Sequence, residues 1–134
     1  MGNTGSTSKK FRQFLTSSGK PVVAGKNAEQ NEKVVEQAGK GEIVLHTKAA
    51  GSPFVNIKAA GAGVSKMDIR EAAVFCARHS RDWKNSKSDV KMHVFKGSSI
   101  YKDKGMKTGT FGVKKFKEIT IKKEEIKMFE ESLK

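Results

Sequence analysis

The sequence has little of what secreted, membrane-spanning or disulfide-linked proteins need. Its 134 residues include one cysteine, which excludes an intrachain disulfide and suits a reducing compartment. No apolar run approaches the roughly 20 residues that a membrane helix needs, and the N-terminus lacks the apolar stretch of a signal peptide. We therefore expect a single-domain cytoplasmic protein without a membrane partner.

Sets of residues that carry out catalysis or bind metal are not recognisable either. The three histidines, His46, His79 and His93, have no metal-ligand spacing among themselves or with Cys76. Cys76 lies on the apolar face of a predicted helix, so we expect a buried, unreactive thiol. Paired carboxylates for acid–base chemistry are missing as well. The sequence predicts no enzyme activity, no metal, no cofactor and no small-molecule substrate.

Acidic residues are few relative to basic ones. Fourteen Asp and Glu stand against 27 Lys and Arg, which gives a formal net charge of +13. The excess is concentrated in residues 81–122, with twelve basic and four acidic residues, whereas residues 123–134 hold three and four. Such a concentration favours a polyanionic partner over a merely lysine-rich surface.

Hydrophobic periodicity predicts an α+β fold, a mostly antiparallel mixed sheet with two main helices and a short C-terminal helix. We expect a disordered tail at 1–9, a domain at 10–122 and a C-terminal helix at 123–134 that packs on this domain. Helices are expected at 28–38, from 65 to about 80, and at 123–133. Strands are expected at 11–16, 21–25, 42–47, 54–57, 90–95 and 99–102, and a hairpin at 110–122 turning at 115–117. Residues 58–64 are expected to form a flexible connection.

The stretch Gly25-Lys26-Asn27-Ala28-Glu29-Gln30-Asn31-Glu32 opens the first helix. Asn27 suits the N-cap, with Gln30 as its partner in a near capping box. Gly25 allows a positive φ or a close backbone approach. Asn31 lies within an apolar stripe, so its amide needs a hydrogen-bonding partner. A clamp on a neighbouring backbone is favoured over a ligand contact, which stays open.

Lysines around a second glycine-containing stretch, Gly61–Lys66, suggest a further phosphate contact. The full spacing of a nucleotide-binding loop is missing, so a plain flexible loop beside Lys58 is the favoured interpretation.

Most of the surplus lysines fall on late strands and loops, where they can follow a phosphate backbone. Lysine outnumbers arginine, which favours backbone contacts over reading of base edges. Among the interleaved aromatic residues, Phe111 is expected in the core, while stacking on bases stays open for Tyr101 and Phe116. For His46, a structural role and a nucleic-acid contact are equally open. The predicted nucleic-acid-binding residues are Lys26, Asn27, Asn31, His46, Lys48, Lys58, Lys102, Lys104, Lys107, Lys114, Lys115 and Lys117.

The stretch from Gly25 to Glu32 resembles the glycine–basic–Asp/Asn–Ala-x-x-Asn-Glu signature of the NFACT-R domain. This domain occurs in ribosome-associated quality-control factors of the nuclear export mediator and fibronectin-binding A-like type. The resemblance covers residues 10–122. Further segments resemble the family's motifs in the family's order. Residues 11–19 resemble its opening strand and turn, and residues 45–47 with 51–53 resemble its His-and-Gly segment. Residues 80–83 resemble its Ser-x-x-Trp helix end, and Gly105 with residues 109–111 resembles its late glycine loop.

The resemblance implies an RNA-binding module that acts in rescue of stalled ribosomes. Its motif positions correspond to Lys26, Asn27, Asn31, His46, Gly51 and Trp83. Because 134 residues leave no room for the other modules of full-length members, we expect a stand-alone domain that does not itself extend nascent chains.

We therefore predict a nucleic-acid-binding module that binds structured RNA, either rRNA or tRNA, in a translation or ribosome-associated quality-control context. The large ribosomal subunit is a further expected partner, and affinity should fall steeply with salt. One alternative is a protein–protein adaptor that docks on a larger quality-control factor through Ile126, Phe129 and Leu133. The other is a DNA-binding or DNA-sensing module, because a compact form of the domain occurs in a DNA-sensing protein. The sequence favours no particular oligomeric state.

Overall fold

The computed structural model describes residues 11–133, so the tail predicted at residues 1–9 lies outside the described part. Six antiparallel strands form the main sheet in the order β1-β2-β4-β3-β5-β8. These strands are β1 (Arg12–Leu15), β2 (Pro21–Ala24), β4 (Val55–Ala60), β3 (Glu42–Thr47), β5 (Val90–Lys96) and β8 (Lys117–Ile121). A second, two-stranded sheet pairs β6 (Ile100–Tyr101) with β7 (Gly112–Val113).

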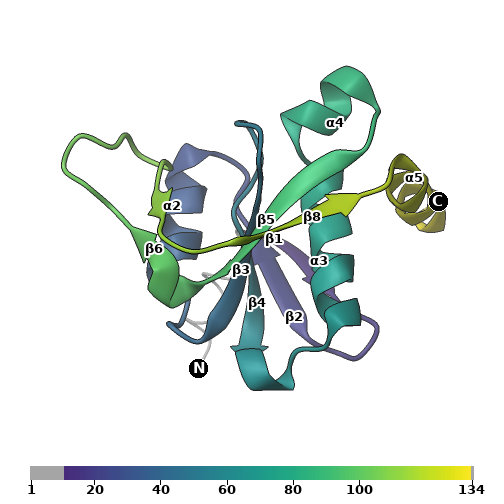
Figure 1. Ribbon diagram of the computed structural model, residues 1–134. Coiled ribbons are helices and arrows are strands. Elements are labelled where there is room, and N and C mark those ends of the chain that lie inside the picture. Colours follow the sequence, from purple (N-terminus) through teal and green to yellow (C-terminus); the bar gives the residue numbers. More distant parts are fainter. Residues whose placement is uncertain (1–10, 134) are drawn as a thin grey trace.

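Helices cover both faces of the main sheet (Figure 1). They are α2 (Ala28–Gln37), α3 (Lys66–Arg78), α4 (Arg81–Ser86) and α5 (Lys123–Ser132), with 3-10 turns η1 (Gly61–Gly63) and η2 (Gly97–Ser99). The predicted α+β class, with a sheet, two main helices and a C-terminal helix, is confirmed. In residues 11–133 no helix has the length and apolar character needed to cross a membrane.

The core is divided by the sheet into two clusters. On one face, α3 and Ile126 of α5 pack against Val22, Leu45, Ile57 and their neighbours. On the other face, Val34 of α2 packs against a smaller cluster that includes Val44 and Phe95. Since α2 is short, it covers only part of its face, and the ends of β3 and β5 beyond it border a groove.

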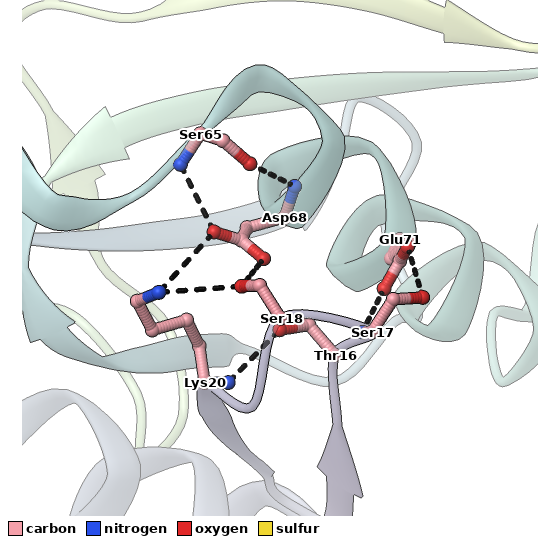
Figure 2. A network of polar contacts seen from close by, with 7 residues as sticks. All are labelled: Thr16, Ser17, Ser18, Lys20, Ser65, Asp68 and Glu71. Atoms are coloured by element: carbon pink, nitrogen blue, oxygen red, sulfur yellow. Dashed lines mark hydrogen bonds and ion pairs between the residues drawn. The ribbon is translucent and has the colours of Figure 1, made fainter.

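The turn between β1 and β2 is fastened to the first turn of α3 (Figure 2). Ser65 caps α3 in a capping box, because Ser65 Oγ accepts from Asp68 N and Asp68 Oδ2 accepts from Ser65 N, both at 3.0 Å. Ser18 Oγ donates to the other oxygen of Asp68 at 2.6 Å. Ser17 N and Oγ both donate to Glu71 at 2.7 Å. These bonds fix the hairpin against the helix.

Three predictions on local structure were wrong. Residues 58–64 are not a flexible connection, because β4 runs to Ala60 and Gly61 N then donates to Gly41 O at 3.0 Å. The predicted hairpin does not form: β7 pairs with β6, whereas β8 pairs with β5. The side chains explain this, since Val113 packs on the α2 side and Ile121 on the α3 side.

The third error lies after α3, which ends at Arg78 and is followed by the unpredicted helix α4. Ser80 acts as the N-cap of α4, with Ser80 Oγ accepting from Trp83 N at 3.1 Å. A helix of six residues has too weak a periodicity to be recognised in the sequence.

Candidate nucleic-acid interface

A groove of about 750 Å³ lies where α2 leaves the sheet uncovered. Its walls are the start of α2, the loop between β3 and β4, the start of α4, and the segment 108–111 before β7. Its floor includes side chains of β3 and β5. Segments far apart in the sequence therefore meet at this site.

The charged side chains that line the groove are basic. Five Lys and Arg side chains and three histidines line it, and no Asp or Glu is among the lining residues in the described part of the chain. We call it the basic groove, defined by its five cations Arg12, Lys26, Lys48, Arg81 and Lys84. Low-dielectric walls focus such a field, which attracts anions.

The N-terminus of α2 adds to this potential, because its unpaired N–H groups and the helix dipole favour negative charge. Asn27 is the N-cap, as predicted, and its Oδ1 accepts from Gln30 N at 2.9 Å. Gln30 departs from the predicted capping box, because its Oε1 accepts from Lys26 N at 3.0 Å. This bond fixes the backbone beside the groove.

Asn31 joins the start of α2 to the sheet. Asn31 Oδ1 accepts from Phe54 N at 3.0 Å, which is the backbone clamp favoured by the sequence. Gly25 makes the clamp possible, since a Cβ at Gly25 would overlap Asn31 Oδ1 and backbone N. Asn31 also lines the groove, so the predicted contact with nucleic acid stays a prediction.

The loop between β3 and β4 is held in one shape by its own polar groups. Ser52 Oγ accepts from Thr47 N and donates to Pro53 O, both at 3.1 Å. Gly51 has a φ of +95°, and its carbonyl oxygen accepts from Arg81 N at 2.8 Å. The bond joins the loop to α4, which places Lys48 and Arg81 on the same groove.

Two of the groove histidines are uncharged at neutral pH. Burial lowers the pKa of His46, and the neighbouring His93 adds to this effect. Burial, followed by Arg12, Arg78 and Lys84, lowers the pKa of His79 to about 4. These two histidines therefore add no charge to that of the groove's Lys and Arg side chains. Within residues 11–133, no group of three or more His, Cys, Asp or Glu is placed to hold a metal ion.

His93 and Phe116 both line the groove. The Phe116 ring is stacked on the His93 ring, with centroids 4.0 Å apart and planes 20° apart. At the edge of its ring, His93 Nε2 lies 3.2 Å from Glu118 Oε1. Lys48 Nζ is 3.8 Å from the same oxygen, so this carboxylate outside the groove partly offsets the charge of Lys48.

Lys102 anchors the segment that forms one groove wall. Its Nζ donates to Lys107 O at 2.6 Å and to Thr110 O at 2.7 Å, and pairs with Glu32 at 3.2 Å. Glu32 Oε1 also accepts from Gly109 N at 2.6 Å. We call these contacts the Lys102–Glu32 clasp.

The structure gathers some of the predicted binding residues and separates others. Lys26, Asn27, Asn31, His46 and Lys48 lie together in the groove. Lys58 lies outside it and pairs with Glu42 at 2.8 Å. Lys104, Lys107, Lys114, Lys115 and Lys117 are exposed beyond the groove lining. Trp83, at a family motif position, is buried, and its Nε1 donates to Glu130 Oε2 at 3.3 Å.

Arg12, Arg81 and Lys84 line the groove but are missing from the sequence-based set. The last two lie one turn apart on α4, so recognising Ser80 as an N-cap would have grouped them. Arg12 lies in the groove because it pairs with Ala24 in the β1–β2 register and its Nη1 donates to Gly25 O at 3.0 Å. No local sequence pattern predicts that contact.

Comparison with known proteins agrees with this architecture. Over 82 residues the chain is 35% identical to the archaeal Rqc2 homolog aRqcH of Methanocaldococcus jannaschii, covering 60% of this chain and 12% of that protein. The C-terminal structure of the fibronectin/fibrinogen-binding protein of Streptococcus suis has the same fold, with a TM-score of 0.77 and 24% identity. That match covers 89% of this chain and 48% of the other. The chain thus spans a small part of the first relative and about half of the second.

The family comparison covers most of the domain. Residues 10–115 match the family described as NFACT protein RNA binding domain, and this range includes the groove-lining residues except Phe116. The chain belongs to the NFACT RNA-binding domain family.

Proposed function

We propose that the basic groove binds the phosphate backbone of structured RNA, either rRNA or tRNA, in ribosome-associated quality control. The observation that carries this proposal is a groove with five cations and no carboxylate among its described lining residues, at the N-terminus of a helix. Membership of an RNA-binding domain family and similarity to an Rqc2 homolog support the choice of RNA and of a quality-control context.

The groove suits the backbone of RNA better than its base edges. Lys26, Arg81 and Lys84 are exposed, so their charged groups are available to phosphates, whereas the exposed Lys48 would exchange its pairing with Glu118 for a phosphate. The lysines at positions 104, 107, 114, 115 and 117 are exposed as well and add to the positive charge of the domain surface. Binding in this mode is weakly sequence-specific and needs no catalytic group, and we propose that the domain works without enzyme activity, in the cytoplasm.

The adaptor alternative is weakened by the packing of α5. Ile126 is fully buried, and Phe129 packs edge-on against Phe14, with ring centroids 5.5 Å apart. Two of the three side chains predicted to dock on a partner are thus used within the domain. Leu133, which is 55% exposed, is the one left for a partner.

A charge-removal experiment tests the proposal. Lys48→Gln with Arg81→Gln removes two groove cations, and we expect affinity for tRNA to fall about tenfold or more at physiological salt. Lys66→Gln with Lys127→Gln is the matched control, because both lysines are exposed and lie outside the groove lining. Fluorescence anisotropy with labelled tRNA gives both affinities.

Equal losses for the two pairs would contradict the proposal, since they would show a response to net charge alone. A DNA of the same sequence and shape, measured in parallel, decides between the two nucleic acids. Tighter binding of the DNA would favour the DNA-binding alternative.

A further inference from the structure

The phosphate-binding proposal does not explain why one aromatic residue of the groove is exposed to solvent. Phe116 directly precedes β8 and is 52% exposed. One face of its ring rests on His93, so the exposed area includes the opposite face. Leaving a large aromatic face in water forgoes the stabilisation of its burial, about 25 cal/mol for each Å² of apolar area.

The His93 ring, on which Phe116 is stacked, is itself held by contacts with its neighbours. His93 Nε2 lies within hydrogen-bond distance of Glu118 Oε1, at 3.2 Å, which orients the imidazole under the phenyl ring. His93 itself is opposite His46 in the β3–β5 register, and the His46 ring packs against Phe54 at 4.3 Å. Phe116 lies in the connection between β7 and β8, and its ring therefore rests on a side chain of strand β5.

Phe111 and Tyr101, the other two aromatic residues considered in the sequence analysis, make different contacts. The Phe111 ring packs edge-on against Phe54 at 5.4 Å, with Lys102 Nζ 4.5 Å from its centroid. The Tyr101 ring lies so close to Gly112 that a Cβ there would overlap it, and it is outside the groove lining. Phe116 combines an open face with a place in the groove.

We propose that Phe116, backed by His93, is a platform on which an unpaired RNA base stacks. The inference rests on the proposed function, because the phosphates of the same strand would lie in the basic groove. Lys115 directly precedes Phe116 in the chain and is exposed, so its charge is available to a phosphate beside the stacked nucleotide. A base within a double helix already has both faces covered, so the ligand is a bulge, a loop or a single-stranded end.

The experiment uses a single-stranded oligouridylate of roughly ten nucleotides, a length within the range of single-strand sites, because uracil bases stack little on their neighbours. It carries a central 2-aminopurine, whose fluorescence is quenched when it stacks. We expect binding to quench the probe and Phe116→Ala to weaken binding by about 5- to 150-fold, the range for loss of one stacked base. Phe116→Trp should restore both affinity and quenching.

Three comparisons separate stacking from a structural role of Phe116. Tyr101→Ala removes an aromatic residue outside the groove lining, and we expect it to leave the affinity unchanged. An oligonucleotide with an abasic position at its centre should bind the wild type more weakly but bind Phe116→Ala no worse than the intact strand. Urea unfolding of each variant shows that the domain is folded.

Two outcomes would overturn the platform. One is a Phe116→Ala variant that binds and quenches like the wild type. The other is a variant that loses the same affinity for a fully paired RNA duplex as for the single strand. If Lys48→Gln with Arg81→Gln still reduces RNA binding in those cases, the groove binds phosphates and only the platform fails. If no RNA binds the wild type, the proposed function fails with it.

Discussion

Asn31 shows how a single polar side chain connects the helix to the sheet. It lies on the face of α2 that carries Val34 and Val35, and Asn31 Oδ1 accepts the backbone N–H of Phe54. The need for a partner follows from the sequence alone, because a buried amide without one is costly. The identity of the partner does not, since Phe54 is 23 residues away and meets Asn31 only after the sheet forms.

Removing this clamp should destabilise the domain. Asn31→Ala leaves Phe54 N–H without its acceptor, and we expect the free energy of unfolding to fall by about 1–3 kcal/mol. Urea denaturation followed by circular dichroism measures the change. Asn85→Ala, at an exposed position of α4, is the control and should change it by less than about 0.5 kcal/mol. Equal changes for the two variants would show that the clamp contributes nothing.

His79 reports on the potential inside the groove. Its pKa in the folded state is about 4, because of burial and then of Arg12, Arg78 and Lys84. The folded protein thus binds fewer protons here than the unfolded chain, so this histidine lowers stability as pH falls from about 6.5 towards 4. An NMR titration should give a pKa well below 6.5, and saturating tRNA should raise it. A pKa at or above 6.5 in the free protein would be inconsistent with a positive groove.

Among the elements, α2 and α3 were the most predictable from sequence. Their starts carry capping residues, Asn27 and Ser65, and their lengths give a readable apolar face. Short elements were not predictable in the same way. Helix α4 has six residues, and β6 and β7 have two each, so their structure depends on tertiary packing rather than on local pattern.

The junction between the β1–β2 turn and α3 should make stability depend on pH. Hydrogen bonds from Ser18 and from the Ser65 backbone hold the pKa of Asp68 well below its usual range. The stabilisation is therefore complete above the unfolded pKa of about 3.9 and is lost as pH falls below it. Asp68→Asn should lower the free energy of unfolding at pH 7, with the difference from wild type shrinking below about pH 4. A difference that stays constant from pH 7 to pH 3 would contradict this assignment.

The Lys102–Glu32 clasp should control the mobility of one groove wall. Lys102→Met keeps the apolar length of the side chain over Phe111 but removes the bonds to Lys107 O and Thr110 O. We expect amide hydrogen exchange at Gly109 and Thr110 to become about tenfold faster, as expected for the loss of a charged hydrogen bond. Exchange in β3 should stay unchanged. Equal exchange rates in variant and wild type would show that the clasp does not hold this segment.

At the scale of the molecule, the sequence predicted the α+β class and the excess of positive charge. It also resembled the NFACT-R family, and the match over residues 10–115 confirms that membership. The groove itself was not predictable, because its cations come from β1, the start of α2, the β3–β4 loop and α4. Only the strand register and the loop contacts of Gly51 and Arg81 bring these segments together.

The salt dependence of tRNA binding tests the central claim most directly. If all five groove cations contact phosphates, log K should fall by roughly 3.5–4.5 for each tenfold rise in salt, and Lys48→Gln with Arg81→Gln should reduce that slope by about 1.4–1.8. The Lys66→Gln and Lys127→Gln pair should keep the wild-type slope. A flat salt titration, or a groove variant with the wild-type slope, would contradict the binding of RNA phosphates in the basic groove.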